Sequence, residues 1–357
     1  MTLNDNVTTQ NKNRNLFLIS SPLQLLNALE AREYYDLNSE NCVLIIFKGS
    51  LKTNYQQMQY MIKTSEWKEL FVLRGGYGTL SWFRRTEHIK LLCKKLGESR
   101  ITKVFLGDYR LDLWHDLLNY ISYGEFILLD DGDATLDIYK NISESTSIGP
   151  SKSEMKQCIK RFAKKIIFNI STRMHKANRT TFFTVFDLNE QCCLKIVKNE
   201  YKYLKKKLEK SILSDEVYFL GKPLSELEIV KESKYLEYLN KLIEYYYPLK
   251  IVYIPHRRES KKKLRSIGNN GIEVKWLNTC LEYELCISET VPKVITSFYS
   301  SAIPNCMEIF GKLIEIHAIK IDQMDISKPM QLEIAEVYTY YEKQYEYDDH
   351  FKLVSLT

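Results

Sequence analysis

The sequence predicts an α/β protein built from two Rossmann-like domains that face each other across a cleft. Short β-rich runs alternate with longer helical patterns along the chain, which is typical of parallel sheets wrapped by helices. A chain of 357 residues is also too long for one ordinary core and suits two domains of similar size. We place the first domain at residues 1–190 and the second at 191–357.

The composition is that of a globular protein, with 45% hydrophobic and 27% charged residues. This balance excludes disordered and collagen-like chains. No apolar run reaches the roughly 18 residues that a membrane span needs, and the first 15 residues are polar and lack the apolar centre of a signal peptide. We therefore expect a cytoplasmic protein.

The first domain begins with a strand over Leu16–Ser20, followed by a helix from Ser21 to about Tyr35. Ser21 is a suitable N-cap and Pro22 suits the first helical position. A second helix is expected over Leu80–Leu96. The polar, Ser- and Thr-rich segment 133–153 is expected to be a mobile loop. The remaining strands of this domain are expected at Val43–Phe47, Leu70–Leu73, Val104–Leu106 and Phe126–Leu129.

The second domain repeats the pattern, with a helix over about Leu227–Tyr247 and another that begins near Ala302. Because ligands of such sheets bind at the carboxyl ends of the strands, the residues directly after each strand are candidate site residues. The strands of this domain are expected at Val217–Gly221, Ile251–Ile254, Ile272–Trp276, Val294–Ser297 and Leu313–His317.

Positive charge is concentrated between the two halves of a chain whose formal net charge is +6. Residues 152–179 contain nine basic side chains and one acid, and apolar residues recur there at three- to four-residue spacing from Met155 to Met174. This pattern predicts a basic amphipathic helix. It either packs on its own domain or docks on an anionic membrane surface, and nucleic acid is a third partner for it. A second lysine-rich run covers residues 201–210.

Neither the cysteines nor the histidines have metal-site spacing. The eight cysteines are scattered, without a C-x-x-C pair or a nearby histidine, and are expected to be reduced core residues. The six histidines are dispersed. We expect no metal site.

Three strand ends carry side chains suited to catalysis. Asp130 and Asp131 follow an apolar strand just before Gly132, where a desolvated carboxylate beside a second one can act as a general base. The alternative is an ordinary acidic turn. His256 follows the strand that ends at Ile254, with Arg257 and Arg258 beside it.

A histidinium at position 256 would protonate a leaving group or hold a phosphate, and Arg257 would add permanent positive charge. The alternative is a histidine hydrogen-bonded within a loop. Ser300 and Ser301 lie at the turn into the last of these helices, where amides and hydroxyls make a phosphate site or simply cap the helix. We read the lysines at 261–263 as a solvated helix face.

The motifs of several common enzyme classes are missing from the sequence. There is no G-x-G-x-x-G, no P-loop and no G-x-S-x-G, which argues against the usual dinucleotide enzymes, P-loop enzymes and serine hydrolases. No D-x-D triplet stands in the strand-end context of a metal-dependent sugar transferase. A metal-free sugar-nucleotide transferase fits best.

The chain resembles the bacterial sialyltransferases of the two-domain GT-B type, especially the polysialyltransferase-like capsule and lipooligosaccharide enzymes. The resemblance is carried first by the opening segment Ser20–Ala31, and second by Asp130-Asp131-Gly132, which matches their D/E-D/E-G motif. It implies that the acid of this motif deprotonates the acceptor hydroxyl, and it favours Asp130 for that role.

The resemblance also assigns roles in the second domain. His256 falls at the family's His-Pro motif, whose histidine assists departure of the CMP phosphate, although Arg257 stands here in place of the proline. Ser300 and Ser301 match the paired serines that bind this phosphate. Glu282 lies where the family has an acid near the cytidine.

The resemblance implies an inverting, metal-independent transferase of sialic acid from CMP-sialic acid to a hydroxyl of a capsule or lipooligosaccharide glycan. CMP is a good monoanionic leaving group, so no metal or other cofactor is expected. The expected partners are the CMP-sugar donor, the glycan acceptor and an anionic inner-membrane surface, with no nucleic acid. Three alternatives remain: transfer of CMP-activated Kdo or pseudaminic acid, a non-catalytic glycan- or membrane-binding protein on the same fold, and a nucleic-acid-binding protein.

Overall fold

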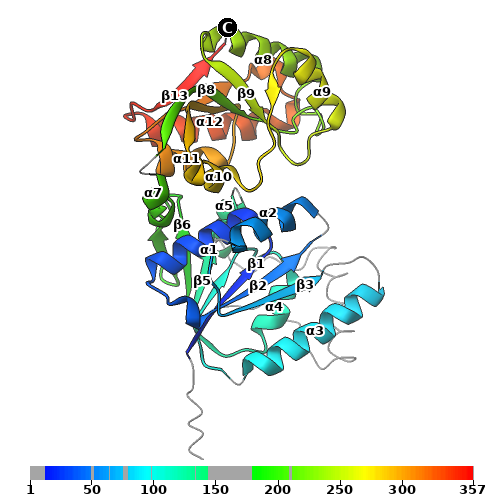
Figure 1. Cartoon of the computed structure of the whole chain (residues 1–357), viewed down its shortest axis with the longest axis vertical. Coiled ribbons are helices and arrows are strands. Elements are labelled where there is room, and N and C mark those ends of the chain that lie inside the picture. The colour runs from blue at the N-terminus through cyan, green and yellow to red at the C-terminus, as the bar shows by residue number, and fades with distance from the viewer. Residues whose placement is uncertain are drawn as a thin grey trace, which may run out of the picture. The chain divides into compact units, whose positions relative to one another are not determined.

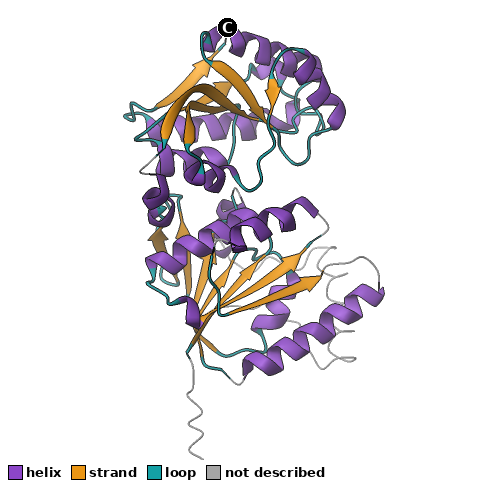
Figure 2. Ribbon diagram, in the orientation of Figure 1, coloured by secondary structure: helices purple, strands orange, loops and turns teal. Residues whose placement is uncertain are grey.

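A computed structural model describes residues 13–356, apart from 50–51, 64, 75–78, 98, 133, 144–178 and 209–210. The chain divides into two compact units, residues 1–199 and 200–357. Each unit contains one parallel sheet with helices between its strands (Figures 1 and 2). The predicted pair of Rossmann-like domains is thereby confirmed.

Unit 1 has a seven-stranded sheet in the order β3-β2-β1-β4-β5-β6-β7. Its strands are β1 (Arg14–Ile19), β2 (Cys42–Lys48), β3 (Glu69–Arg74), β4 (Ile101–Leu106), β5 (Tyr123–Leu129), β6 (Thr180–Thr184) and β7 (Leu194–Lys198). Its helices are α1 (Pro22–Tyr34), α2 (Lys52–Lys63), α3 (Thr79–Gly97), α4 (Asp112–Leu118) and α5 (Ala134–Ser143). The sequence pattern did not predict β6 and β7.

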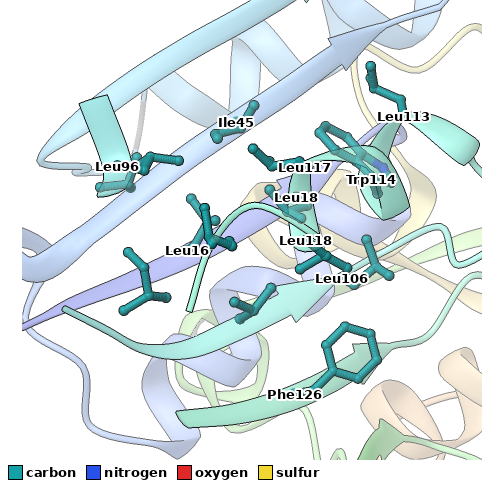
Figure 3. Close-up of a cluster of buried hydrophobic side chains, with 14 of the residues drawn as sticks. Leu16, Leu18, Ile45, Leu96, Leu106, Leu113, Trp114, Leu117, Leu118 and Phe126 are labelled. Carbon is teal, nitrogen blue, oxygen red and sulfur yellow. The ribbon is translucent and has the colours of Figure 1, made fainter. Parts of the chain in front are cut away.

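The core of unit 1 lies between the sheet and the helices α3, α4 and α5 (Figure 3). Leu16 and Leu18 of β1 contribute to it, whereas Phe17 between them points to the opposite face and stacks on Phe105 of β4. Both faces of the central strands are therefore covered, which explains their almost continuous apolar runs.

Unit 2 has a six-stranded sheet in the order β10-β9-β8-β11-β12-β13. Its strands are β8 (Ile212–Leu220), β9 (Lys250–Ile254), β10 (Glu273–Val274), β11 (Thr290–Ser297), β12 (Glu315–Lys320) and β13 (Phe351–Ser355). Its helices are α7 (Lys202–Leu208), α8 (Glu232–Tyr246), α9 (Lys261–Asn269), α10 (Leu281–Ile287), α11 (Ala302–Phe310) and α12 (Gln331–Tyr345). In both sheets the first strand of the unit is central and the order reverses beside it, which is the doubly wound arrangement.

The boundary between the units lies after Asn199, later than the predicted one at residue 190. The reason is β7, which pairs in parallel with β6 and so extends the first sheet. In unit 2, β12 begins at Glu315 rather than Leu313, and α8 begins at Glu232 rather than Leu227.

Two further expectations are wrong where the structure describes the chain. The polar segment after Asp133 does not begin as a loop, because Ala134–Ser143 forms α5 and buries Ile138 in the core. Cys192 and Cys193 are exposed rather than buried. The predicted basic amphipathic helix lies outside the described residues. None of the described helices has the length and apolarity needed to cross a membrane.

Candidate functional site

The acid pair of unit 1 lies at the carboxyl end of β5, and its two carboxylates have different surroundings. Asp130 is 1% exposed. Its Oδ2 accepts a hydrogen bond of 2.7 Å from the backbone N–H of Val185, just after the neighbouring strand β6. Its Oδ1 is buried and has no hydrogen-bond partner among the residues that the structure describes. Such an atom is costly unless it serves a ligand or a proton.

Burial raises the pKa of Asp130 from 3.8 to about 6. The Val185 hydrogen bond, the nearby side chains of Thr184 and Thr135 and the charge of Lys198 act in the opposite direction, but burial is the largest cause. A carboxylate that titrates near neutral pH is well matched to accepting a proton from a hydroxyl group.

Asp131 is more accessible and both of its carboxylate oxygens are engaged. Oδ1 accepts a hydrogen bond of 2.7 Å from Gln24 Nε2, and Oδ2 forms an ion pair of 2.7 Å with Arg110 Nη2. The Asp131 side chain is 15% exposed. Asp131 is therefore held in place as a carboxylate, with Arg110 as its counter-ion.

Helix α1 supplies the groups that hold this strand end. Ser21 caps the helix by accepting the N–H of Gln24, as the sequence predicted. The Gln24 carboxamide accepts hydrogen bonds from both the N–H and the hydroxyl of Ser20, which orients its NH₂ group toward Asp131. A Cβ atom at Gly107 would collide with the Gln24 side chain, so the glycine makes room for this contact.

Asn27 lies on the same face of α1, three residues after Gln24. Its Nδ2 donates to the Asp130 carbonyl at 3.1 Å, and its Oδ1 accepts from Asn199 Nδ2 at 3.1 Å. Gln24 and Asn27 are 1% and 0% exposed. The opening segment identified in the sequence therefore acts here as a support for Asp130 and Asp131.

In unit 2, three neighbouring strands end in polar side chains. Because β9, β8 and β11 are adjacent and parallel, their carboxyl ends lie along one edge of the sheet. His256 follows β9, Lys222 follows β8, and Ser300 and Ser301 follow β11. Lys222 was not among the predicted site residues, although its position directly after a buried strand and Gly221 is a signal that points to it.

His256 is neutral at pH 7. Burial lowers its pKa from 6.5 to about 4, and the positive charges of Arg257, Arg258, Lys222 and Lys263 act in the same direction. Its Nδ1 accepts the backbone N–H of Arg258 at 3.2 Å, which assigns the ring proton to Nε2. The expected histidinium is thus wrong, and the side chain instead presents an uncharged Nε2–H donor.

A buried ion pair fixes the backbone of His256. The N–H of His256 donates to Glu259 Oε2 at 2.6 Å, and Glu259 Oε1 lies 2.7 Å from Lys263 Nζ. Both of the paired side chains are 0% exposed. Burial raises the pKa of Glu259, while Lys263 opposes this. The interpretation of Lys263 as part of a solvated face is wrong, since it points inward from α9.

The serine pair stands at the start of α11. The N–H of Ser300 donates to the Tyr341 hydroxyl, which in turn donates to the Ser300 carbonyl at 2.8 Å, and the Ser300 hydroxyl accepts the N–H of Ala302. Ser301 is the N-cap residue, yet its side chain makes no capping bond. Both serines are partly exposed at a helix end that favours negative charge.

Glu282 and Arg257 complete the set of predicted site residues. Glu282 of α10 is only 5% exposed and accepts a hydrogen bond of 3.0 Å from Asn305 of α11, and burial raises its pKa. In this structure it therefore joins two helices, and its contact with a nucleoside stays a prediction. Arg257 is exposed beside His256. Within the described ranges no three His, Cys, Asp or Glu residues are grouped as metal ligands would be.

Two doubly wound units, each with polar side chains at the carboxyl ends of its strands, form the architecture of the GT-B glycosyltransferases. Glycosyltransferase family 52 is the particular family, because its sequence profile matches residues 39–323, and the chain belongs to it. The match includes the acid pair, His256 and the serine pair but begins after the opening segment 20–31. No curated protein sequence matches the chain.

Several solved structures are similar to this chain. An α/β-galactoside α-2,3-sialyltransferase from the luminous marine bacterium Photobacterium phosphoreum is similar over 96% of this chain and 99% of its own, with 12% identity and a TM-score of 0.52. UDP-GlcNAc 2-epimerase from Neisseria meningitidis is similar over 94% of this chain and 92% of its own (12% identity, TM-score 0.47). The E. coli heptosyltransferase WaaC is similar over 94% of this chain and 99% of its own (10% identity, TM-score 0.41).

Proposed function

We propose that this protein transfers sialic acid from CMP-sialic acid to a hydroxyl group of a bacterial surface glycan, a capsule or lipooligosaccharide. Membership of family 52 and the fold shared with a bacterial α-2,3-sialyltransferase support this class of reaction. The observation that carries the proposal is that one chain has both a candidate base and candidate groups to stabilise a leaving phosphate. Unit 1 offers a carboxyl group whose pKa is about 6, and unit 2 offers a neutral histidine, a lysine and two serines for an anionic leaving group.

The proposed chemistry is a single displacement with inversion. The acceptor oxygen forms a bond to the anomeric carbon of the sugar while the bond from that carbon to the CMP phosphate oxygen breaks. The acceptor proton passes to Asp130, and the bonding electrons leave with CMP. A base in this role contributes about 10²- to 10⁴-fold.

Unit 2 would stabilise the charge that develops on the departing phosphate. His256 would donate from Nε2, and the serines would donate hydroxyl and amide hydrogens, as in other preorganised anion sites. Because the leaving group is a nucleoside monophosphate, its charge is small enough for these donors, and we expect no divalent cation to be needed.

Asp130 is the proposed base because its Oδ1 has no competing partner among the described residues, whereas Asp131 is occupied by Gln24 and Arg110. Oδ1 is covered by the fold, so the acceptor reaches it only if binding opens this strand end. Asp131, which is partly exposed, is the alternative base.

The test is to measure CMP release from CMP-sialic acid, CMP-Kdo and CMP-pseudaminic acid, with and without candidate acceptors. We expect release from CMP-sialic acid, and a loss of at least about 10²-fold for Asp130→Ala and for His256→Ala. Asp131→Ala should be milder, and the reverse order would exchange the two roles. Release from another donor would move the proposal to that sugar acid, and no release from any donor would support a binding protein.

A further inference from the structure

Lys222 brings a cation to the middle of the strand ends of unit 2 that carry His256 and the serine pair. Its strand, β8, lies between β9, which leads to His256, and β11, which leads to the serine pair. Ligands of doubly wound sheets bind at the carboxyl ends of the strands, where the order reverses, and this reversal is at β8. Lys222 therefore stands at the position in the sheet where a nucleotide is expected.

The backbone of Lys222 is held on both sides by buried groups. Its N–H donates to the Tyr235 hydroxyl at 3.2 Å, and its carbonyl accepts from Lys263 Nζ at 2.9 Å. Tyr235 and Lys263 are both 0% exposed. The position of Lys222 is thus fixed by the interior of the unit and not only by the loop that carries it.

The same buried groups hold His256. Lys263 is paired with Glu259, whose other oxygen accepts the His256 N–H, and the Tyr235 hydroxyl lies 2.7 Å from that of Tyr253, which donates to Glu259. One network of hydrogen bonds therefore fixes the ends of β8 and β9 relative to each other. A network of this kind preorganises the groups attached to it, so that less ordering is needed when a ligand binds.

The side chain of Lys222 contacts the aromatic residue that precedes the serine pair. Its Nζ lies 3.5 Å from the centroid of the Tyr299 ring, and Tyr299 directly precedes Ser300. The ring face attracts the ammonium group and so helps to orient it. The Lys222 charge is also close enough to His256 to help lower the pKa of that imidazole.

We infer that the ammonium group of Lys222 binds the phosphate of the donor nucleotide, between His256 and the pair Ser300 and Ser301. The inference rests on the proposed function and adds to it a residue that touches the leaving group. Lysine is a compact cation that suits a phosphate, and charged hydrogen bonds to phosphate are about twice as strong as neutral ones. Burial is the largest cause of the low pKa of His256, and the Lys222 charge adds to it. A phosphate would offset that charge and raise the pKa of the imidazole.

The experiment compares the binding of CMP and of cytidine, by calorimetry or by NMR titration, to the parent and three variants. These variants are Lys222→Met, Lys222→Arg and Lys262→Met, the last being an exposed lysine of α9 that serves as the charge-matched control. We expect Lys222→Met to weaken CMP by about 10- to 100-fold, cytidine to be unchanged, and Lys222→Arg to restore most of the affinity. Lys262→Met should bind CMP like the parent.

A separate readout needs no nucleotide. Removing a nearby cation in Lys222→Met should raise the pKa of His256, followed by NMR of the imidazole, whereas Lys262→Met should leave it where it is. An unchanged His256 pKa would show that Lys222 is not beside the histidine.

Three results would overturn the inference: CMP affinity equal to that of the parent, an equal loss for CMP and cytidine, or weakened binding of CMP-sialic acid with unchanged binding of CMP. The last would assign Lys222 to the sugar carboxylate. If the parent binds a different nucleoside monophosphate in place of CMP, the proposed donor fails, and the Lys222 comparison is made with that nucleotide and its nucleoside. If it binds none, both proposals fail.

Discussion

Replacing Asp130 with asparagine is expected to stabilise unit 1 and, at the same time, to lower transfer by at least about 10²-fold. The carboxyl group is 1% exposed, and its pKa of about 6 lies above the ordinary value of 3.8. The folded state therefore holds the Asp130 proton more tightly than the unfolded chain does. The stability that this proton provides is present below about pH 3.8 and is lost as the pH rises through about 6.

The size of the effect follows from the two pKa values. A difference of about two pH units corresponds to about 3 kcal/mol lost by the charged form above pH 7. Asparagine has nearly the same shape, can accept the Val185 N–H and carries no charge. We therefore expect Asp130→Asn to raise the free energy of unfolding by up to about 3 kcal/mol at pH 8, and by about half as much at pH 5.

Denaturant unfolding at the two pH values measures this difference, with Asp131→Asn as the matched control. Asp131 is partly exposed and paired with Arg110, so its replacement should cost about 0 to 1 kcal/mol instead of stabilising. If Asp130→Asn is neutral or destabilising at both pH values, the carboxyl group is not a strained, buried acid, and its proposed role as a base loses its physical ground.

The remaining predictions concern the buried ion pair of unit 2, the expected independence of metal ions and the binding to membranes. Lys263→Met leaves the Glu259 carboxylate buried without its counter-ion and should destabilise the protein by about 3 to 5 kcal/mol. Lys262→Met, the control, should have almost no effect. Equal effects of the two variants on the denaturation midpoint would contradict the buried ion pair. Saturating EDTA should leave CMP release nearly unchanged, and a loss of activity that only Mg²⁺ or Mn²⁺ restores would argue for a metal-dependent reaction. If the segment 155–174 docks on the inner membrane, the parent should co-sediment with anionic vesicles at low salt and less at high salt, each basic residue contributing about 1 kcal/mol. A variant with Gln at the four lysines between 156 and 165 should not co-sediment with the vesicles. Equal co-sedimentation of the parent and the variant would show that the segment has no membrane role.

Local signals in the sequence were enough to predict the elements that carry the site. The Ser21-Pro22 start of α1 and the apolar runs before Asp130 and His256 are decided by neighbours within a few residues, and the structure has them where the pattern placed them. The same local reasoning failed for α5. Its Ser- and Thr-rich surroundings indicated a loop, but burial of Ile138 against the sheet outweighs that weak preference.

The contacts that support the site could not be predicted from one sequence, because they join residues far apart in the chain. Gln24 meets Asp131 across 107 positions, and Lys263 meets the Lys222 carbonyl across 41. Lys263 belongs to a run of three lysines, and such a run indicates a solvated helix face unless the buried partner Glu259 is known. Hydropathy therefore identified the strand ends, while the polar groups that hold them became visible only in three dimensions.

The turn at His256 shows how such a contact can replace a local constraint. In the family pattern a proline follows the histidine and restricts the backbone there, whereas this chain has Arg257. Here the N–H of His256 is bound to the Glu259 carboxylate, and the carbonyl of His256 accepts the N–H of Glu259 at 2.9 Å. These two hydrogen bonds to Glu259, which is anchored by Lys263, restrict the turn without a proline ring. The substitution of the proline is therefore compatible with an ordered histidine, and Glu259 is the residue on which that order depends.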